Sequence, residues 1–203
     1  NARLVSEIKT WLPAFVDYTF LYKTYIGTMR VVRFHLFDMN ACFVLLAAGL
    51  VYFKCQSTEK TLFAVIVFFA LQLVLKGPFG GMNCIAPFNG PIGWKPVVAL
   101  LIAVVEYGFL IWCVFSASAA RKIKFFVFFA CMLSFAVPAL MGFSPTIWAS
   151  ADRTFLPGEF MLVTLGAALF GFSGIGRNDF WKVLYLCLLV AGPRLVRLVI
   201  TMA

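Results

Sequence analysis

Six apolar segments, separated by short breaks rich in polar residues, proline or glycine, constrain this chain more than any other feature. They are Phe37–Phe53, Thr61–Leu75, Pro96–Ser116, Phe125–Phe143, Phe160–Gly174 and Phe180–Met202. A helix needs about 20 mostly apolar residues to cross a bilayer, or somewhat fewer when aromatic and basic residues flank it. With 63% hydrophobic and 12% charged residues, the chain has more apolar surface than a soluble domain buries. We therefore predict an all-α fold, a polytopic transmembrane helical bundle with about six spanning helices.

The N-terminal segment differs from the rest, because charged and aromatic side chains are interleaved every few positions. This pattern predicts an amphipathic helix that lies at the membrane interface or packs on the bundle. The alternative is a substrate-facing segment whose basic residues lie near lipid phosphates. We divide the chain into an interfacial segment, 1–36, and a transmembrane helical domain, 37–203. Because the chain begins at Asn1 without the pattern of a signal peptide, we expect a processed protein or a piece of a longer one.

Basic residues are concentrated in the break 117–124, and basic loops of membrane proteins stay in the cytoplasm. The three residues of this cluster are Arg121, Lys122 and Lys124. By helix parity the same side also holds Lys54, Lys60, Arg177 and Lys182. The segments Lys76–Lys95 and Ser144–Glu159 are then expected together on the opposite, extracytoplasmic face.

Five glycines and four prolines fall within Lys76–Pro96 and exclude a continuous helix there. The segment is either a rigid connector or a re-entrant loop that lines a cavity, because irregular backbone at membrane depth needs protein or water to satisfy it. In the second case, Asn83, Asn89 and Trp94 are candidate polar and stacking contacts for a sugar.

The segment Ser144–Glu159 places Asp152, Arg153 and Glu159 between two apolar helices. Arginine is the side chain best suited to bidentate recognition of phosphate or carboxylate. Arg153 either reaches lipid headgroups or pairs with one of the two acids, or it grips the phosphate of a lipid-linked substrate. A polyprenyl phosphate fits both an apolar groove and a cationic mouth.

Glu106 lies near the middle of an apolar helix, where a carboxylate is energetically expensive. It must face the bundle interior, a cavity or a partner. A proton or ion pathway is one interpretation, and a hydrogen-bonded or protonated structural carboxyl is the other. Because no neighbouring helix carries a second buried acid, we favour the structural role.

Metal, redox and nucleotide chemistry lack a signal in this sequence. His35 is the single histidine, which excludes bis-histidine haem within the chain, and the cysteines are scattered without a CxxC pair. No hydrolase or phosphate-loop motif is present. We expect no metal and no cofactor. The net charge of +9 indicates anionic lipid surfaces rather than nucleic acid in a chain this apolar.

The order of features from Arg121 to Phe155 resembles a known family. A basic stretch, an apolar helix with Pro138, a Ser144-Pro145 pair, a polar turn with Arg153 and then Phe155 look like the C-terminal half of bacterial GT-C type multi-spanning glycosyltransferases, in particular the O-antigen glucosyltransferase-like group. The resemblance implies a cell-envelope enzyme of the bacterial inner membrane that transfers sugar from a polyprenyl-phosphate donor to a glycan or lipid acceptor. It implies a lipid-phosphate contact for Arg153. No acid here matches the family's catalytic residue, so that residue is unknown.

Two other classes of function fit the same pattern. A non-catalytic subunit of a larger membrane complex, bound to partner membrane subunits, explains the Phe-rich helices. A small-solute or ion transporter would use Glu106 and the Gly/Pro-rich loop, although residues 37–116 and 125–203 do not resemble each other as transporter repeats do. In each class the expected partners are membrane lipids, and for the enzyme also a polyprenyl-phosphate sugar.

Overall fold

Helices make up every regular element in the part of the chain that the computed structural model describes, residues 6, 15–37, 41–76, 94–144 and 155–202. The α-helices are α2 (Phe20–Val32), α3 (Ala41–Cys55), α4 (Thr58–Lys76), α5 (Trp94–Ser116), α6 (Arg121–Leu140), α7 (Leu156–Phe172) and α8 (Arg177–Met202). Short 3-10 turns, η1 (Phe15–Asp17) and η3 (Met141–Phe143), and a π-helical turn, η2 (Arg33–Phe37), complete the order. The predicted all-α fold is confirmed.

Each predicted apolar segment corresponds to one of the helices α3 to α8. Within the described residues, one helix is long and apolar enough to cross a membrane, namely Arg121–Phe143, which joins α6 and η3. A second is counted if Phe20–Leu36 and Ala41–Cys55, bent by 78° from each other, form one span. Leu100–Ser116 and Leu156–Phe172 are shorter apolar helices.

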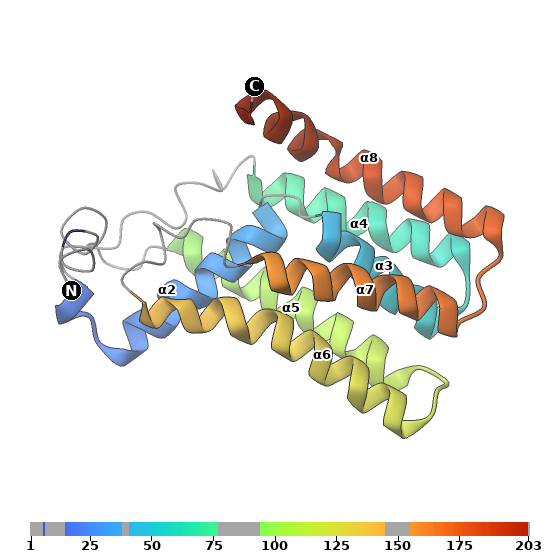
Figure 1. Ribbon diagram of the computed structural model, residues 1–203, viewed down its shortest axis with the longest axis horizontal. Coiled ribbons are helices and arrows are strands. Elements are labelled where there is room, and N and C mark those ends of the chain that lie inside the picture. The colour runs from blue at the N-terminus through green and yellow to red at the C-terminus, as the bar shows by residue number, and fades with distance from the viewer. Residues whose placement is uncertain (1–5, 7–14, 38–40, 77–93, 145–154, 203) are drawn as a thin grey trace.

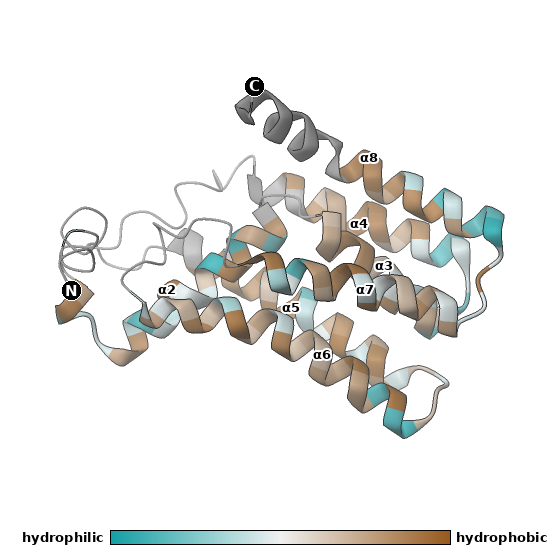
Figure 2. Cartoon of the chain, viewed as in Figure 1, coloured by the Kyte–Doolittle hydropathy of each residue, from teal (hydrophilic) through white to brown (hydrophobic). Residues whose placement is uncertain are grey.

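Helix α3 lies at the centre of the bundle and contacts α4, α5, α7 and α8 (Figure 1). Its sequence is apolar on every face, and a helix of that kind is stable only where neighbours surround it. The buried side chains of α3 run without interruption from Phe43 to Leu50, apart from half-buried Leu45. Polar residues gather toward the helix ends, as the colouring by hydropathy shows (Figure 2).

Paired glycines bring two sets of elements into backbone contact. A Cβ on Gly49 of α3 would lie 2.9 Å from the carbonyl oxygen of Gly166 in α7, closer than such atoms approach in proteins. Gly27 of α2 meets the backbone of Ala139 and Gly142 in the same way. Small residues at helix crossings allow this approach and increase the packing area on both sides. The glycines thus fix α7 on α3 and α2 on the end of α6.

The N-terminal helix α2 packs on the bundle. Met29, Val32 and Leu36 are buried in the same apolar cluster as the side chains of α3, and α2 contacts α6 and η3. Of the two arrangements expected for an amphipathic N-terminal helix, at the membrane interface or packed on the bundle, α2 has the second. The basic residues of α2 and η2 are thereby placed beside the C-terminal end of α6.

The breaks after α3, α5 and α7 lie together at one end of the bundle (Figure 1). Lys54 Nζ donates a hydrogen bond to the Ser116 carbonyl oxygen at 2.6 Å, and Lys124 Nζ donates to that of Phe115 at 2.9 Å. Lysines here satisfy the free carbonyls at the C-terminus of α5 and complement its dipole. The expected gathering of basic residues at one end is confirmed; we call this the basic end.

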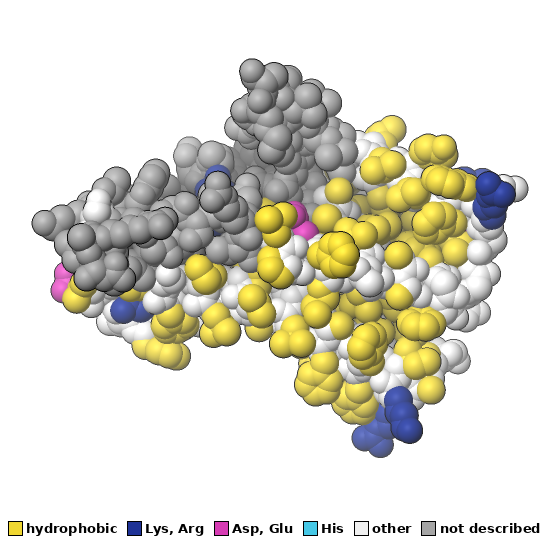
Figure 3. Space-filling model, viewed as in Figure 1, with side chains coloured by type: hydrophobic (Ala, Val, Ile, Leu, Met, Phe, Trp, Pro, Cys, Tyr) yellow, Lys and Arg dark blue, Asp and Glu magenta, His cyan; other side chains and the backbone are white. Residues whose placement is uncertain are grey.

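Large apolar side chains cover much of the surface as well as the core (Figure 3). Exposed examples occur on every α-helix except α3, among them Leu21, Phe63, Val105, Phe126, Phe160 and Leu189. On α3 the largest residues are instead buried. Soluble monomers rarely expose contiguous apolar surface of this extent.

Candidate functional site

Most of the site residues predicted from the sequence lie outside the described residues. This holds for Asn83, Asn89, Asp152 and Arg153. Trp94 begins α5, but its side chain is not described. Glu159 and Glu106 are both described, on α7 and α5.

Glu159 lies in the first turn of α7 and is half-buried. An acid in that position interacts favourably with the positive N-terminal end of the helix dipole. Pro157, near the start of the helix, provides the backbone geometry that a first turn needs and has no amide hydrogen to leave unpaired. The start of α7 is therefore well defined by its sequence.

Phe155 anchors the start of α7 to the N-terminal segment. Its ring is 1% exposed and stacks on Phe34 of η2 with centroids 3.9 Å apart. The guanidinium of Arg30 lies over the Phe155 ring, 5.8 Å from its centroid. Because Phe155 follows Arg153 by two positions, the chain places Arg30 beside the end of the segment that carries the predicted phosphate ligand.

His35 is buried at the junction of four elements, with an exposed fraction of 2%. A hydrogen bond of 3.1 Å joins its Nδ1 to Tyr107 Oη of α5. Its ring stacks on Phe43 of α3 at 5.0 Å and meets Phe135 of α6 edge-on at 5.1 Å. The tyrosine fixes the orientation of the imidazole and satisfies one of its nitrogens.

Glu106 precedes Tyr107 on α5 and is 2% exposed. Neither carboxyl oxygen has a hydrogen-bond partner within the described residues. Burial of a carboxyl without donors carries a large desolvation cost, so native proteins rarely keep such a group without a reason. The sequence favoured a structural carboxyl, either hydrogen-bonded or protonated, and the hydrogen-bonded form lacks a partner among the described residues.

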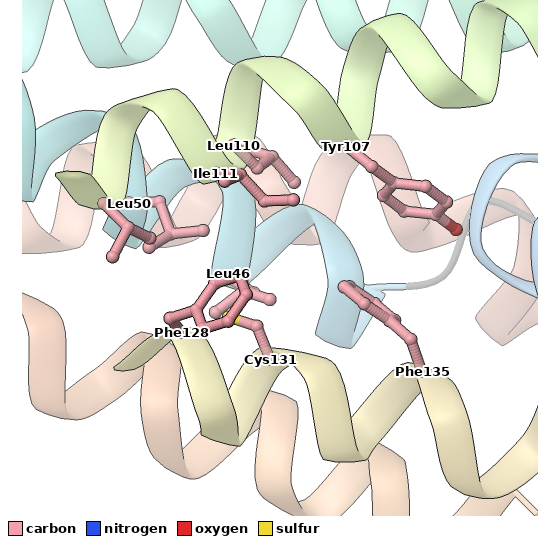
Figure 4. A pocket seen from close by; sticks show the side chains of 9 residues that line it. Leu46, Leu50, Tyr107, Leu110, Ile111, Phe128, Cys131 and Phe135 are labelled. Carbon is pink, nitrogen blue, oxygen red and sulfur yellow. The ribbon is translucent and has the colours of Figure 1, made fainter. Parts of the chain in front are cut away.

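An apolar crevice lies between α5 and α6, with α3 as its floor (Figure 4). Tyr107 and Phe135 line one end and turn toward the His35 contact, while the remaining lining is aliphatic, aromatic or thiol. Those residues are Leu46, Leu50, Leu110, Ile111, Val114, Phe128 and Cys131. Phe135 also packs against the cluster of Val31, Phe34 and Phe155. Phe135 therefore contacts both the crevice and the aromatic cluster next to Arg30.

Sequence reasoning identified Glu106 and Glu159 but missed Arg30, His35 and Tyr107 as members of a site. The partner of His35 lies 72 positions away, a distance that no local pattern reveals. A polar signal was nonetheless present, since a single histidine next to an aromatic-rich stretch is unusual. Among the described residues, no group of three or more His, Cys, Asp or Glu side chains forms a metal site.

No protein-family model matches the sequence, and no curated protein or solved structure is significantly similar to it. Any function is therefore inferred from the residues and contacts described above.

Proposed function

We propose that this chain is an integral membrane protein in which α3 to α8 are six spans and the break 117–124 lies in the cytoplasm. The exposed apolar side chains along these helices support this arrangement, because lipid would cover them. The basic end supports the orientation, since short cytoplasmic loops are rich in Lys and Arg. The opposite end, with α2 and the start of α7, then faces the extracytoplasmic side.

At that opposite end we propose a binding site for a polyprenyl phosphate that donates a sugar, as in a membrane glycosyltransferase or part of one. The observation that carries the proposal is the position of Arg30, whose guanidinium lies 5.8 Å from the centroid of the Phe155 ring. Phe155 directly precedes α7 and follows Arg153 by two positions in the sequence. In this proposal Arg153 joins Arg30 at the phosphate, because guanidinium groups suit the several oxygens of a phosphate diester or monoester.

The second part of such a substrate would enter at the apolar crevice, which at about 10 Å³ has room for no more than a water-sized group, so α5 and α6 must move apart to admit a prenyl chain. A prenyl chain needs an apolar surface that continues up to the phosphate-binding cations. The aromatic residues Phe135, Phe34 and Phe155 form that connection, because they pack in one cluster between the crevice and Arg30. In this proposal Asn83, Asn89 and Trp94 contact the sugar, and Asp152 and Glu159 orient the arginines.

The test is the binding of a polyprenyl phosphate to the full chain in lipid nanodiscs. Arg30→Ala should weaken binding about tenfold to a hundredfold, since a hydrogen bond to a charged group contributes about 1.5–3 kcal/mol. Arg30→Lys keeps the charge and should retain part of the affinity. Arg177→Ala, at the basic end, is the matched control and should bind as the wild type does. Unchanged binding in Arg30→Ala would rule out this site.

The unpartnered carboxyl of Glu106 favours a second candidate, an ion or proton pathway. Acids inside membrane bundles commonly mark such pathways. If this candidate holds, proteoliposomes of the wild type carry a cation or proton flux that Glu106→Gln abolishes. If the glycosyltransferase proposal holds, the vesicles show no such flux, and sugar transfer depends on Arg30.

A further inference from the structure

The first turn of α6 concentrates positive charge that the described part of the protein does not neutralise. Arg121 and Lys122 are exposed and form neither a hydrogen bond nor an ion pair with another described residue. Lys124 is engaged with the carbonyl of Phe115, and the turn contains no acid. Cations at the start of a helix are also disfavoured by the helix dipole, so local helix stability does not explain them.

The first turn of α8 lies at the same end of the bundle and offers a direct contrast. There Asp179 accepts a hydrogen bond of 2.9 Å from Lys182, and a hydrogen bond from Thr58 ties it to α4. The ion pair with Lys182 offsets the charge of that lysine. The start of α8 thus holds an acid that neutralises one of its two cations, whereas the first turn of α6 holds no acid.

An exposed apolar stripe continues from the charged turn of α6 along the helix. Lys122 is followed at intervals of three or four residues by Phe126, Phe129, Leu133, Val137 and Leu140. Side chains at this spacing share one face, and all five are exposed, with Phe126 at 63% and Phe129 at 59%. From Phe126 to Leu140 the stripe is about 21 Å long at 1.5 Å per residue, more than half of a bilayer core of about 30 Å.

We propose that this face of α6 binds an anionic phospholipid, with its phosphate at Arg121 and Lys122 and an acyl chain along the apolar stripe. The cations lie at the depth of a headgroup and the stripe at the depth of its chain, which neither a free anion nor an apolar partner would match. Figure 3 shows this arrangement, with the dark blue side chains where α6 begins and hydrophobic side chains immediately above them. Arg121 stays near the surface of the helix by packing over Phe125, 5.4 Å from its centroid.

This inference goes beyond the proposed substrate site, which lies at the other end of the bundle. The two can fail independently, because one is tested with polyprenyl phosphate and Arg30 variants and the other with phospholipid and α6 variants. Only the membrane location is common to both.

The experiment titrates the full chain in detergent with phosphatidylglycerol and counts bound lipids by native mass spectrometry. Each cation at a membrane surface contributes about fivefold to binding, so Arg121→Gln with Lys122→Gln should weaken the first binding event about 25-fold. The charge-conserving pair Arg121→Lys with Lys122→Arg should bind nearly as the wild type does. Arg177→Gln, in the first turn of α8 where Asp179 lies two positions away, should change binding less than twofold.

Further titrations distinguish an anionic phospholipid from the other ligands that this face of α6 could bind. Phosphatidylcholine should bind weakly and equally to all variants, and inorganic phosphate at the same concentration should not displace phosphatidylglycerol. Equal binding of phosphatidylglycerol to the wild type and the Gln pair would overturn the proposal, as would an equal loss in Arg177→Gln. Displacement by inorganic phosphate would show that the cations bind a free anion and that the apolar stripe does not contribute. A dimer mass in place of bound lipid would mean that a second copy of the chain covers the stripe. Either of these last two results would overturn the lipid proposal.

Discussion

At the scale of single residues, the polar groups inside the bundle differ in how well they are satisfied. His35 is held by Tyr107 and by aromatic rings on two sides, so its cost of burial is offset by contacts. Glu106, only one position from Tyr107, has no hydrogen-bond donor among the described residues. A buried polar group without a partner costs about 1–3 kcal/mol, which makes Glu106 the weakest point of the described core.

Replacement of Glu106 by leucine, an apolar side chain of similar size, should therefore raise thermal stability. We expect the melting temperature of the purified protein to rise by about 2–12 °C, since 1 kcal/mol shifts it by about 2–4 °C in a chain of this size. Val104→Leu, on the exposed face of the same helix, is the control and should shift it little. A lower melting temperature in Glu106→Leu would mean that the carboxyl has a stabilising partner.

The sequence located Glu106 because an acid in an apolar run stands out in any reading of hydropathy. It did not locate Arg30 or His35 as site residues, because their importance arises from tertiary contacts with α7 and α5. Arg30 lay within a segment where charge and aromatic residues alternate, and neither interpretation of that segment singled it out. The roles of Asn83, Asn89 and Arg153 remain predictions, since these residues lie outside the described part of the chain.

At the scale of helices, the apolar segments predicted the number and order of α3 to α8 well, because long apolar runs form helices wherever lipid or protein surrounds them. Their ends were less predictable. The sequence placed the second segment at Thr61–Leu75, whereas α4 runs from Thr58 to Lys76 and so extends into polar residues. Likewise, α8 continues through the Gly192-Pro193 pair, a sequence that commonly kinks or ends a helix.

The contact between α3 and α7 should be sensitive to a single methyl group. In Gly49→Ala the new Cβ would meet the Gly166 carbonyl oxygen at 2.9 Å, which forces the helices apart. We expect a loss of about 1–3 kcal/mol in the free energy of unfolding, as for other overpacked cores. Chemical denaturation of the reconstituted chain measures it.

Gly108→Ala provides the matched control, since a Cβ there meets no atom within 4 Å. Alanine is the better helix former, so this variant should gain up to about 1 kcal/mol. A pair of variants with effects of the same sign would contradict the close approach of α3 and α7.

The contribution of the basic end to the stability of the bundle should depend mainly on Lys54. Its ammonium donates to Ser116 O at 2.6 Å and lies 5.5 Å from the Trp112 ring centroid, and both contacts join α3 to the end of α5. Lys54→Met should lower the free energy of unfolding by about 1–2 kcal/mol. Lys60→Met, at an exposed position on α4, should stay within about 0.5 kcal/mol of the wild type in the same denaturation measurement.

At the scale of the whole molecule, the bundle has two unlike ends. One gathers the three short breaks and their lysines and arginines, and the other joins α2, η3 and the start of α7. If the chain spans the membrane as proposed, these ends lie in different compartments. The sequence predicted this division from charge and parity alone, whereas the packing of α2 on α6 depends on the glycine contact between Gly27 and Gly142.

Labelling of single cysteines tests the orientation. Cys55 is exposed at the basic end, and Val16 is exposed near the opposite end. In cells, a membrane-impermeant maleimide should label a variant with Val16→Cys as its single cysteine from outside, and one that keeps only Cys55 after permeabilisation alone. Labelling of both from the same side would contradict a bundle that crosses the membrane with these ends apart.

The central claim, a polyprenyl-phosphate site at the end that carries Arg30, is tested most directly by a density map of the full chain in nanodiscs with added polyprenyl phosphate. The account predicts a phosphate beside Arg30 and the start of α7, with its prenyl chain in the crevice between α5 and α6. Density for the phosphate at the basic end, or an empty crevice with Arg30 bound only to protein groups at saturating lipid, would contradict it.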